Sequence, residues 1–525
     1  MKRRRLWKFH GGVHLPQQKT ISTTMPVHAA QLPKRLVLPL HQHIGASAKA
    51  VVEVGDNVLK GELIAHASGY VSAPIHAPSS GTVVAIADHP IPHPSGLHAP
   101  CIVIETDGEE RWVEARPYDD YLHMDPSHLR NLVREAGIVG LGGAGFPSYI
   151  KLNPGADKVI DTLILNGAEC EPFITCDDML MREQPEQIVE GLHILQHALR
   201  AKRCIIALED NKPEAYTALS AAVAKSERCN IIEIVQIPTI FPAGGEKQLI
   251  KVLTGKEVPH DGLPLHIGLV IQNVATCAAI HRAINLGQPL ISRYVTITGG
   301  GVSQPRNLEV LIGTPIQELL EQCGALDIEP QRLIMGGPMM GIAVHTSSAP
   351  IIKTSNCVIA ATDDDLPSPQ PVMPCIRCGA CADACPALLL PQQLYWYARA
   401  KNLERIQEIN LFDCIECGCC SHVCPSHIPL VQYFRFAKTE IWSQEREKER
   451  ADLARQRHDS RLERIEREKA ERAARLQKKK QALKERSAGD SSKKAAIAAA
   501  VKRAQEKKAR QQTKEPSANE EDSSQ

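Results

Sequence analysis

Two short cysteine runs in this chain have the residue types and the spacing that bind a redox cofactor. Both read C-x2-C-x2-C-x3-C-P, from Cys375 to Pro386 and from Cys414 to Pro425. Thiolates at this spacing bind the iron atoms of [4Fe–4S] clusters. The two runs therefore predict two cubane clusters, each of which exchanges one electron at a time.

Zinc is the alternative for such cysteines, because C-x2-C pairs also form structural tetrahedral zinc sites. A single pair would favour zinc. Two complete runs of four cysteines, each followed by a proline, favour iron–sulfur clusters instead. Cys419 lies within the second run but outside its spacing, and we expect it not to be a ligand.

The two runs resemble those of bacterial ferredoxins that carry two clusters. In those proteins the fourth cysteine of each run binds the cluster of the other run. The resemblance implies that one cluster is bound by Cys375, Cys378, Cys381 and Cys424. It implies that the other cluster is bound by Cys414, Cys417, Cys420 and Cys385.

A glycine-rich segment upstream, residues 137–147, is a second candidate site. Its glycines would let the backbone approach a phosphate closely with the amides pointing inward, and Lys151 could meet the phosphate charge. A turn that binds no ligand is the alternative for this loop alone. Asn166 and Glu169 follow a buried apolar run, at the end of a predicted strand where open α/β sheets bind ligands.

Four segments in this order resemble the flavin- and NADH-binding subunit of respiratory complex I. They are residues 137–151, 165–172, 242–247 and 272–276. The resemblance implies that FMN is held by Gly140, Gly142, Gly143, Lys151, Asn166, Glu169, Asn273 and Thr276. It implies that NAD(H) faces Phe146, Glu171 and Glu246.

Two residues depart from that pattern. Leu141 stands where the complex I loop has arginine, and Lys247 stands where it has a second glutamate. Both departures change the charge expected beside the nucleotide, and with it the expected affinity for NADH and the pose of the dinucleotide.

The first part of the chain that must position these sites is rich in β-strand signals. Residues 37–120 contain short apolar runs cut by Gly, Pro and Asp, and they resemble a lipoyl/biotinyl-like β-sandwich. The matching hairpin tip, residues 66–70, has no lysine for a prosthetic group, so we expect no swinging arm. Histidines of this region show no ligand spacing and are expected in solvated loops: His41, His43, His76, His89, His93 and His98.

The rest of the chain predicts a multidomain protein of α/β, β and α parts. Residues 121–290 alternate helix and strand, which indicates an α/β layout with buried parallel strands from Val159 and from Cys204. The complex I resemblance implies that this part is a Rossmann-like flavin domain. Residues 291–345 resemble a β-grasp (SLBB-like) module. Residues 366–443 hold the cysteine runs and helical linkers, as expected of a helical ferredoxin-type domain with two [4Fe–4S] clusters.

The two ends differ from the domains between them. Residues 1–36 form an N-terminal segment without a clear pattern. Residues 444–525 are rich in Lys, Arg, Glu and Ala, which predicts a solvated charged helix and a disordered acidic end near Glu520. A coiled coil or docking to a membrane surface is the alternative for this tail.

Length and composition limit the classes of function. The 525 residues are too many for one core, and a net charge of +1 gives no overall attraction to nucleic acid. No stretch reaches the roughly 18 uninterrupted apolar residues of a membrane span. The basic start lacks the apolar segment of a signal peptide. We therefore expect a reducing cytoplasm, in which the cysteines outside the two runs are free thiols.

The order of these segments, from residue 5 to residue 440, resembles the RnfC family, the C subunits of Rnf/Rsx electron-transport complexes. The resemblance implies a peripheral protein on the cytoplasmic side of the bacterial inner membrane, held there by partner subunits that include a ferredoxin-type protein. It implies an NADH-linked oxidoreductase that couples electron transfer between NAD(H) and that partner, through FMN and two clusters, to ion translocation. The alternative is an iron–sulfur relay and docking scaffold without a functional flavin/NADH site, which Leu141 and Lys247 favour.

Overall fold

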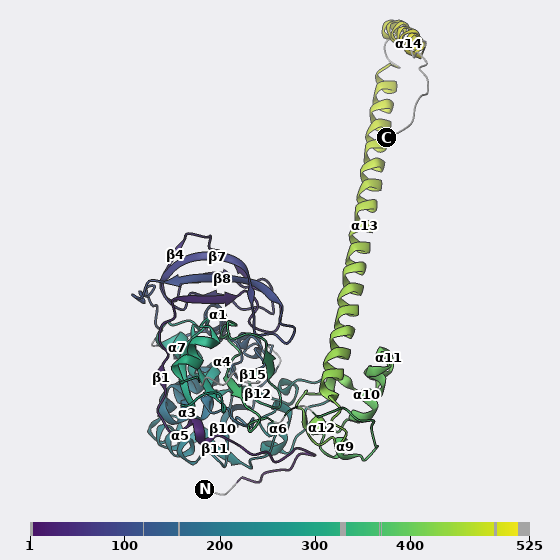
Figure 1. The fold of residues 1–525 in the computed structure, drawn as a ribbon. Coiled ribbons are helices and arrows are strands. Elements are labelled where there is room, and N and C mark those ends of the chain that lie inside the picture. Colours follow the sequence, from purple (N-terminus) through teal and green to yellow (C-terminus); the bar gives the residue numbers. More distant parts are fainter. Residues whose placement is uncertain are drawn as a thin grey trace, which may run out of the picture. The chain divides into compact units, whose positions relative to one another are not determined.

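The structure, a computed structural model, describes residues 4–118, 120–155, 158–325, 332–366, 368, 370–487 and 491–512. The chain divides into two compact units, residues 1–438 and residues 439–525 (Figure 1). The acidic end expected to be disordered lies outside the described residues.

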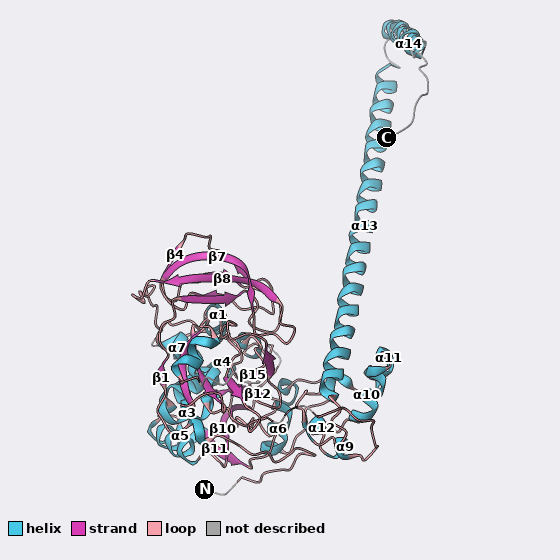
Figure 2. Ribbon diagram, viewed as in Figure 1, coloured by secondary structure: helices cyan, strands magenta, loops and turns pink. Residues whose placement is uncertain are grey.

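The N-terminal domain is built from antiparallel strands in two sheets, drawn in magenta in Figure 2. The first sheet has the order β2-β8-β7-β4 and the second β3-β5-β6. The strands are β2 (Arg35–Pro39), β3 (Lys49–Ala50), β4 (Asn57–Val58), β5 (Leu63–His66), β6 (Ile75–His76), β7 (Gly81–Pro90) and β8 (His98–Thr106). Alternate apolar residues, such as Leu36 and Leu38 of β2, are buried. The expected β-rich domain is confirmed.

Two of the six histidines expected in solvated loops are buried instead. His43 and His76 are 6% and 8% exposed. The ring of His43 accepts a hydrogen bond from the Ala73 amide at 2.9 Å, and burial lowers the pKa of His76 to about 3. His76 belongs to β6, and the chain around it carries glycine, proline and serine, so the local pattern did not indicate that these rings pack inward.

The middle domain has a parallel sheet with the order β11-β10-β9-β12. Its strands are β9 (Thr162–Gly167), β10 (Arg203–Glu209), β11 (Ile232–Ile237) and β12 (Leu269–Asn273). Leu163 and Leu165 contact the core beneath the helices of one face, and Ile164 contacts the core on the other face. Burial on both faces is typical of parallel sheets and explains the continuous apolar runs. The strand expected from Val159 begins at Thr162, since Val159 is 70% exposed.

Helices cover both faces of this sheet and begin at recognisable signals. They are α1 (Pro126–Glu135), α2 (Ser148–Lys151), α3 (Cys176–Glu183), α4 (Pro185–Leu199), α5 (Pro213–Lys225), α6 (Glu246–Thr254) and α7 (Val274–Asn285). Proline occupies the first turn of α1, α4 and α5, where its missing amide costs no hydrogen bond. The Asn273 side chain caps α7 by accepting from the amides of Ala275 and Thr276.

The next domain is a mixed sheet that takes in strands from outside residues 291–345. Its order is β1-β14-β13-β17-β15-β16. Its elements are β1 (His28–Ala29), β13 (Ser292–Thr298), β14 (Arg306–Leu311), α8 (Ile316–Gln322), β15 (Arg332–Met335), β16 (Ile342–Val344) and β17 (Cys357–Ala361). The N-terminal segment thus supplies an edge strand, β1, which pairs in parallel with β14.

The cysteine runs lie among short helices. These are α9 (Ala380–Asp383), α10 (Pro391–Arg399), α11 (Leu403–Glu408), α12 (Cys419–His422) and the start of α13 (Leu430–Ser487). The helical linkers expected in this region are confirmed. In the second unit, α13 continues and α14 spans Ser491–Gln512, with most described side chains exposed. A charged, solvated helix is therefore confirmed for the tail.

Candidate functional site

The structure gathers the cysteines of the two runs around two cavities, which we call the first and the second thiol set. The cavity of the first set is lined by Cys375, Cys378, Cys381 and Cys424. The cavity of the second set is lined by Cys385, Cys414, Cys417 and Cys420. Each set combines three cysteines of one run with the fourth cysteine of the other run. Four convergent thiols are the donor set that a [4Fe–4S] cluster requires, so the residues fit that group.

The two runs have the same backbone path. Arg377 and Glu416, at matching places between the first and second cysteines, both have a positive φ, of 57° and 58°. Gly379 and Gly418 also match, with φ of 85° and 82°, and each precedes one turn of helix. This left-handed conformation is accessible to glycine without strain. The repeated geometry turns the backbone around each cavity in the same way.

The two sets differ in exposure. Cys378 of the first set is exposed, and the neighbouring Ile376 side chain is 68% exposed. In the second set Cys385, Cys417 and Cys420 are buried. The first set is therefore the one nearer to solvent.

Cys419 does not line either cavity. Its Sγ atom faces the carbonyl of Phe241 at 4.0 Å, and the residue is fully buried. A hydrogen bond with Cys417, together with burial, raises the pKa of the Cys419 thiol. A thiol that lies outside both cavities is consistent with the expectation that Cys419 is not a ligand, which remains a prediction.

The predicted flavin residues meet at the carboxyl edge of the parallel sheet. Asn166 and Asn273 are direct neighbours in the register of β9 and β12. The glycine loop, residues 137–147, packs against the start of α7, where the Leu141 amide donates to Thr276 Oγ1 at 2.9 Å. A Cβ atom at Gly142 would lie 3.4 Å from the Asn273 side chain. Segments far apart in sequence therefore form one polar edge.

The polar side chains of this edge also bind one another. Lys151 Nζ lies 2.5 Å from Glu246 Oε2 and donates to the carbonyl of Ile271. Asn166 donates to the carbonyl of Gly244 at 2.7 Å, and Asn273 donates to Asp177 Oδ2 at 2.5 Å. Lys151, Asn166 and Asn273 are half-buried, and each retains an N–H that these bonds do not use.

The tip of the glycine loop is open. Gly142, Gly143 and Ala144 are exposed, and a Cβ atom at Gly143 would meet nothing within 4 Å. Within the described part of the chain, the amides of these three residues find no acceptor. The base of the loop is closed, because the Gly140 amide donates to the Phe146 carbonyl at 2.8 Å. Free amides in a glycine-rich turn fit the anionic end of a flavin nucleotide.

Glu169 has partners on α3 and in the N-terminal segment. Its carboxylate accepts from the amides of Asp177 and Asp178 at the start of α3, at 2.7 and 3.3 Å. Lys19 Nζ lies 3.9 Å away and also donates to the Glu169 carbonyl. Burial raises the pKa of Glu169 to about 8. In this structure Glu169 stabilises the segment that follows β9, and its assignment to the FMN site stays a prediction.

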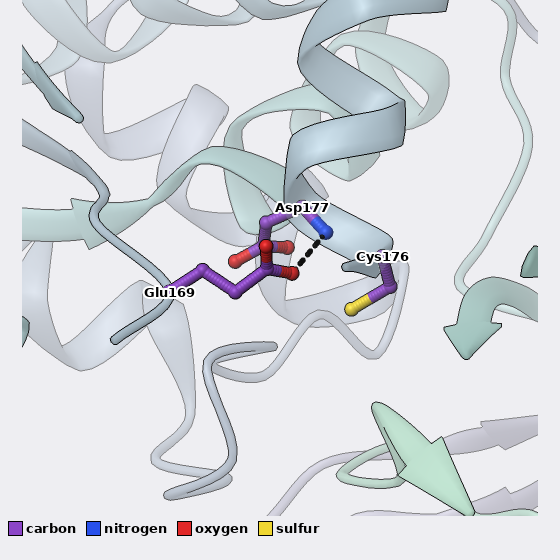
Figure 3. A group of neighbouring side chains, drawn as sticks. All are labelled: Glu169, Cys176 and Asp177. Carbon is purple, nitrogen blue, oxygen red and sulfur yellow. Dashed lines mark hydrogen bonds between the residues drawn. The ribbon is translucent and has the colours of Figure 1, made fainter. Parts of the chain in front are cut away.

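Figure 3 shows the buried group formed by Glu169, Cys176 and Asp177, whose ligand-type atoms lie within 4.8 Å of one another. Its carboxylates already have partners: the Asp177 amide, the Asn273 amide group and the ammonium of Lys19. We therefore assign this group to the support of the sheet edge and not to a metal.

Glu171 lies close to the second thiol set. Its carboxylate accepts from the amides of Met339 and Met340, at 3.1 and 2.8 Å, and burial raises the pKa of Glu171 to about 7. A Cβ atom at Gly337 would lie 2.2 Å from Glu171 Oε2, so only glycine leaves room for the carboxylate. Met339 also packs with the buried residues around Cys417.

Helix α6 connects the sheet edge with the second thiol set. It begins at Glu246, and the next two side chains contact the cysteine loops. Lys247 forms an ion pair with Asp413 at 3.2 Å, directly before Cys414. Gln248 donates to the carbonyl of Pro386, directly after Cys385, at 3.3 Å. The lysine that departs from the complex I pattern thus binds the adjoining cysteine domain.

The sequence did not indicate three buried cations. Lys19 donates to the carbonyls of Glu169, Glu171 and Ile174. Arg293 and Lys353, from the mixed sheet, reach the glycine loop from behind. None of them belongs to a local motif, so only a signal that links distant positions could have found them.

Four domain families match successive parts of the chain. Residues 7–109 match the RnfC barrel sandwich hybrid domain, and residues 133–282 match the Nuo51 FMN-binding domain. Residues 294–343 match the SLBB domain, and residues 374–428 match the 4Fe-4S dicluster domain. The expected order of domain types and the expected cofactors, FMN and iron–sulfur clusters, are confirmed.

Curated relatives match most of the chain, and each is named as the C subunit of an ion-translocating oxidoreductase complex. The protein of Pseudomonas aeruginosa is 52% identical over 89% of this chain and 60% of its own length. That of Serratia proteamaculans is 49% identical over 91% of this chain and 67% of its own length. That of Yersinia pestis is 47% identical over 90% of this chain and 75% of its own length. The chain thus spans only about 60% of the length of some relatives.

A solved NAD+-reducing [NiFe]-hydrogenase shares 22% identity with a TM-score of 0.43, over 55% of each chain. This likeness is too low to support an argument. Among the helices that the structure describes, none has the length and apolar character needed to cross a bilayer.

Proposed function

Because the chain belongs to the family of C subunits of ion-translocating oxidoreductase complexes, we propose that it is a peripheral redox subunit of such a complex. In this proposal it transfers electrons between NAD(H) and a ferredoxin-like partner, and partner subunits couple that transfer to ion translocation. The chain itself supplies the sites for FMN and for two [4Fe–4S] clusters.

The cofactors would be held by side chains that the structure gathers. The two thiol sets would each bind one cluster, so the fourth cysteines are exchanged between the runs. The glycine loop, Lys151, Asn166 and Asn273 would hold FMN, while Thr276 fixes the loop from below. Phe146, Glu171 and Glu246 would face the nicotinamide nucleotide. Bound flavin supplies the exchange between two-electron and one-electron chemistry that a hydride donor and a cubane require.

One observation carries this proposal: the first turn of α6 contacts both the flavin edge and the loops of the second thiol set. Glu246 lies in contact with Lys151 at the edge, and Lys247 and Gln248 contact the loops of Cys414 and Cys385. The same helix therefore fixes the distance between the two sites. We infer that the second set receives electrons from the flavin side, and that the more exposed first set exchanges them with the partner.

Finer features of the assignment belong to the same proposal. We propose a lipoyl-like sandwich over residues 37–120, a Rossmann-like domain over 121–290 and a β-grasp module over 291–345. The cluster domain would span residues 366–443 and the tail 444–525. The cytoplasmic side of the bacterial inner membrane is the proposed location, with attachment through other subunits.

An NADH oxidation assay tests the proposal. The anaerobically purified chain, supplied with FMN, is expected to oxidise NADH with an artificial electron acceptor and to retain the flavin through gel filtration. A chain that keeps its iron but shows neither activity nor flavin retention would instead support an iron–sulfur relay and docking scaffold. Lys247→Glu gives this position the charge of the complex I pattern but also breaks the ion pair with Asp413, so its iron content is measured together with its NADH oxidation.

A further inference from the structure

The glycine loop carries no cation of its own at the position where complex I has arginine, since Leu141 stands there. Leu141 is 3% exposed and faces inward. When a loop binds an anion through backbone amides alone, its affinity for the anion depends on how firmly those amides are oriented. The structure offers a cation from another domain at this place.

Arg293, at the second position of β13, lies directly behind the loop. Its guanidinium donates to the carbonyl of Leu141 at 3.0 Å and to the carbonyl of Lys353. Lys353 in turn donates to the carbonyls of Gly137 and Pro74, both at 2.7 Å. Arg293 is 5% exposed and Lys353 is 1% exposed. Two buried cations, one in β13 and one in the turn before β17, thus hold both the start and the middle of the loop.

The bond from Arg293 fixes the direction of one amide. The Leu141–Gly142 peptide is trans, and in a trans peptide the C=O and N–H groups point in opposite directions. Because the Leu141 carbonyl points at Arg293, the Gly142 amide points away from it, towards the exposed side of the loop. The Leu141 amide is fixed separately by Thr276. The amide and the carbonyl of Leu141 are therefore both anchored by hydrogen bonds.

The positive charge of Arg293 also acts on the exposed side of the glycine loop, towards which the Gly142 amide points. Among the described residues, no carboxylate lies within ion-pair distance of its guanidinium, although the Cys176 thiol hydrogen-bonds to its side chain and the Asp177 carboxylate attracts its charge. Burial lowers the pKa of Arg293, whose side chain is held by neutral carbonyls. A buried positive charge is weakly screened, so it polarises the peptide dipole whose N–H end faces the loop opening.

We propose that Arg293 is a positioning residue for the flavin site: it aims the Gly142 amide at an anionic group of the flavin and supplies the positive charge that Leu141 lacks. The inference rests on the proposed flavin function of the loop. The anionic group is either the phosphate or the reduced ring, and the two are separated by comparing FMN with riboflavin.

The test uses the full chain, purified anaerobically with its clusters. Arg293→Met removes the charge and the hydrogen bonds, and Arg293→Lys keeps the charge but loses the forked geometry. Arg282→Gln is the matched control, because Arg282 pairs with Glu309 at 2.6 Å and does not contact the loop. Iron content and circular dichroism report whether each variant folds. The readouts are the dissociation constants for FMN and riboflavin and the midpoint potential of bound flavin.

We expect Arg293→Met to weaken FMN binding at least about tenfold, as for loss of a charge-assisted hydrogen bond, and to lower the flavin potential. Arg293→Lys is expected to lose affinity while the potential stays closer to wild type. Should Arg293→Met fail to fold, Arg293→Lys against Arg282→Gln still decides the question. Loss for FMN alone identifies the phosphate, and equal loss for riboflavin identifies the ring.

Wild-type affinity and potential in folded Arg293 variants would overturn this inference and leave the flavin proposal intact. Absence of flavin binding by the wild-type chain would overturn both. The two failures are therefore distinguishable.

Discussion

Replacing Thr276 with valine removes one hydroxyl beneath the glycine loop and little else. Thr276 is fully buried, and its Oγ1 accepts the hydrogen bond of the Leu141 amide at 2.9 Å. Valine has nearly the same shape, and the cap of α7 uses the backbone amide of residue 276, which the substitution keeps. The expected defect is therefore local: the Leu141 amide loses its acceptor in a buried place.

The size of the defect follows from that geometry. A buried donor left without a partner costs about 1–3 kcal/mol. If the loop escapes this cost by leaving the conformation that binds FMN, the dissociation constant rises by a factor of about 5 to 150, with about tenfold as the central expectation. The thiol sets do not contact Thr276, so the iron content should not change.

Fluorescence titration of FMN into the anaerobic, flavin-free chain measures this effect. Thr276→Ser is the control, because serine keeps the hydroxyl and should bind FMN nearly as wild type does. The reasoning is refuted if the valine variant binds FMN within about twofold of wild type, or if valine and serine weaken binding equally.

Three further predictions concern the thiol sets, the expected nucleotide pocket and the N-terminal domain. Cys385→Ala should remove the cluster of the second thiol set and about half of the iron, whereas Cys419→Ala should keep nearly all of it; equal iron loss, measured by metal analysis and EPR, would contradict the ligand assignment. Gly337→Ala places a Cβ atom 2.2 Å from Glu171 Oε2, so it should displace that carboxylate and raise the KM for NADH with the iron unchanged; an unaltered KM would argue against a role for Glu171. Burial lowers the pKa of His76 from 6.5 to about 3 in the folded chain. As the pH falls between these two values, the unfolded chain gains a proton that the folded chain does not, so the free energy of unfolding decreases. In denaturant titrations, His76→Leu should reduce this decrease in the free energy of unfolding by up to about 1.4 kcal/mol per pH unit. An unchanged pH dependence of stability would show that the burial of His76 does not cause the acid sensitivity.

The sequence was most informative where chemistry depends on neighbours along the chain. The cysteine spacing defines each loop within a dozen residues, and the structure brings the same eight cysteines together in two sets. The buried strands of the middle domain were readable for the same reason, since burial on both faces leaves an unbroken apolar run.

The sequence was least informative where support comes from distant segments. Lys19, Arg293 and Lys353 are buried because backbone carbonyls of other domains surround them. Nothing beside them in the chain indicates this, and lysine or arginine is ordinarily read as exposed. His43 was misplaced because its partner, Ala73, lies in another part of the same domain. The ion pair of Lys247 could not be predicted from the sequence either, because its partner Asp413 lies in another domain.

The most direct test of this account is the iron, acid-labile sulfide and flavin content of the anaerobically isolated chain, followed by addition of NADH. We expect about eight iron and eight sulfide per chain, as two cubanes require, with FMN bound, and bleaching of the visible absorbance by NADH. A colourless chain without labile sulfide, or a brown chain whose spectrum NADH leaves unchanged in the presence of FMN, would contradict it.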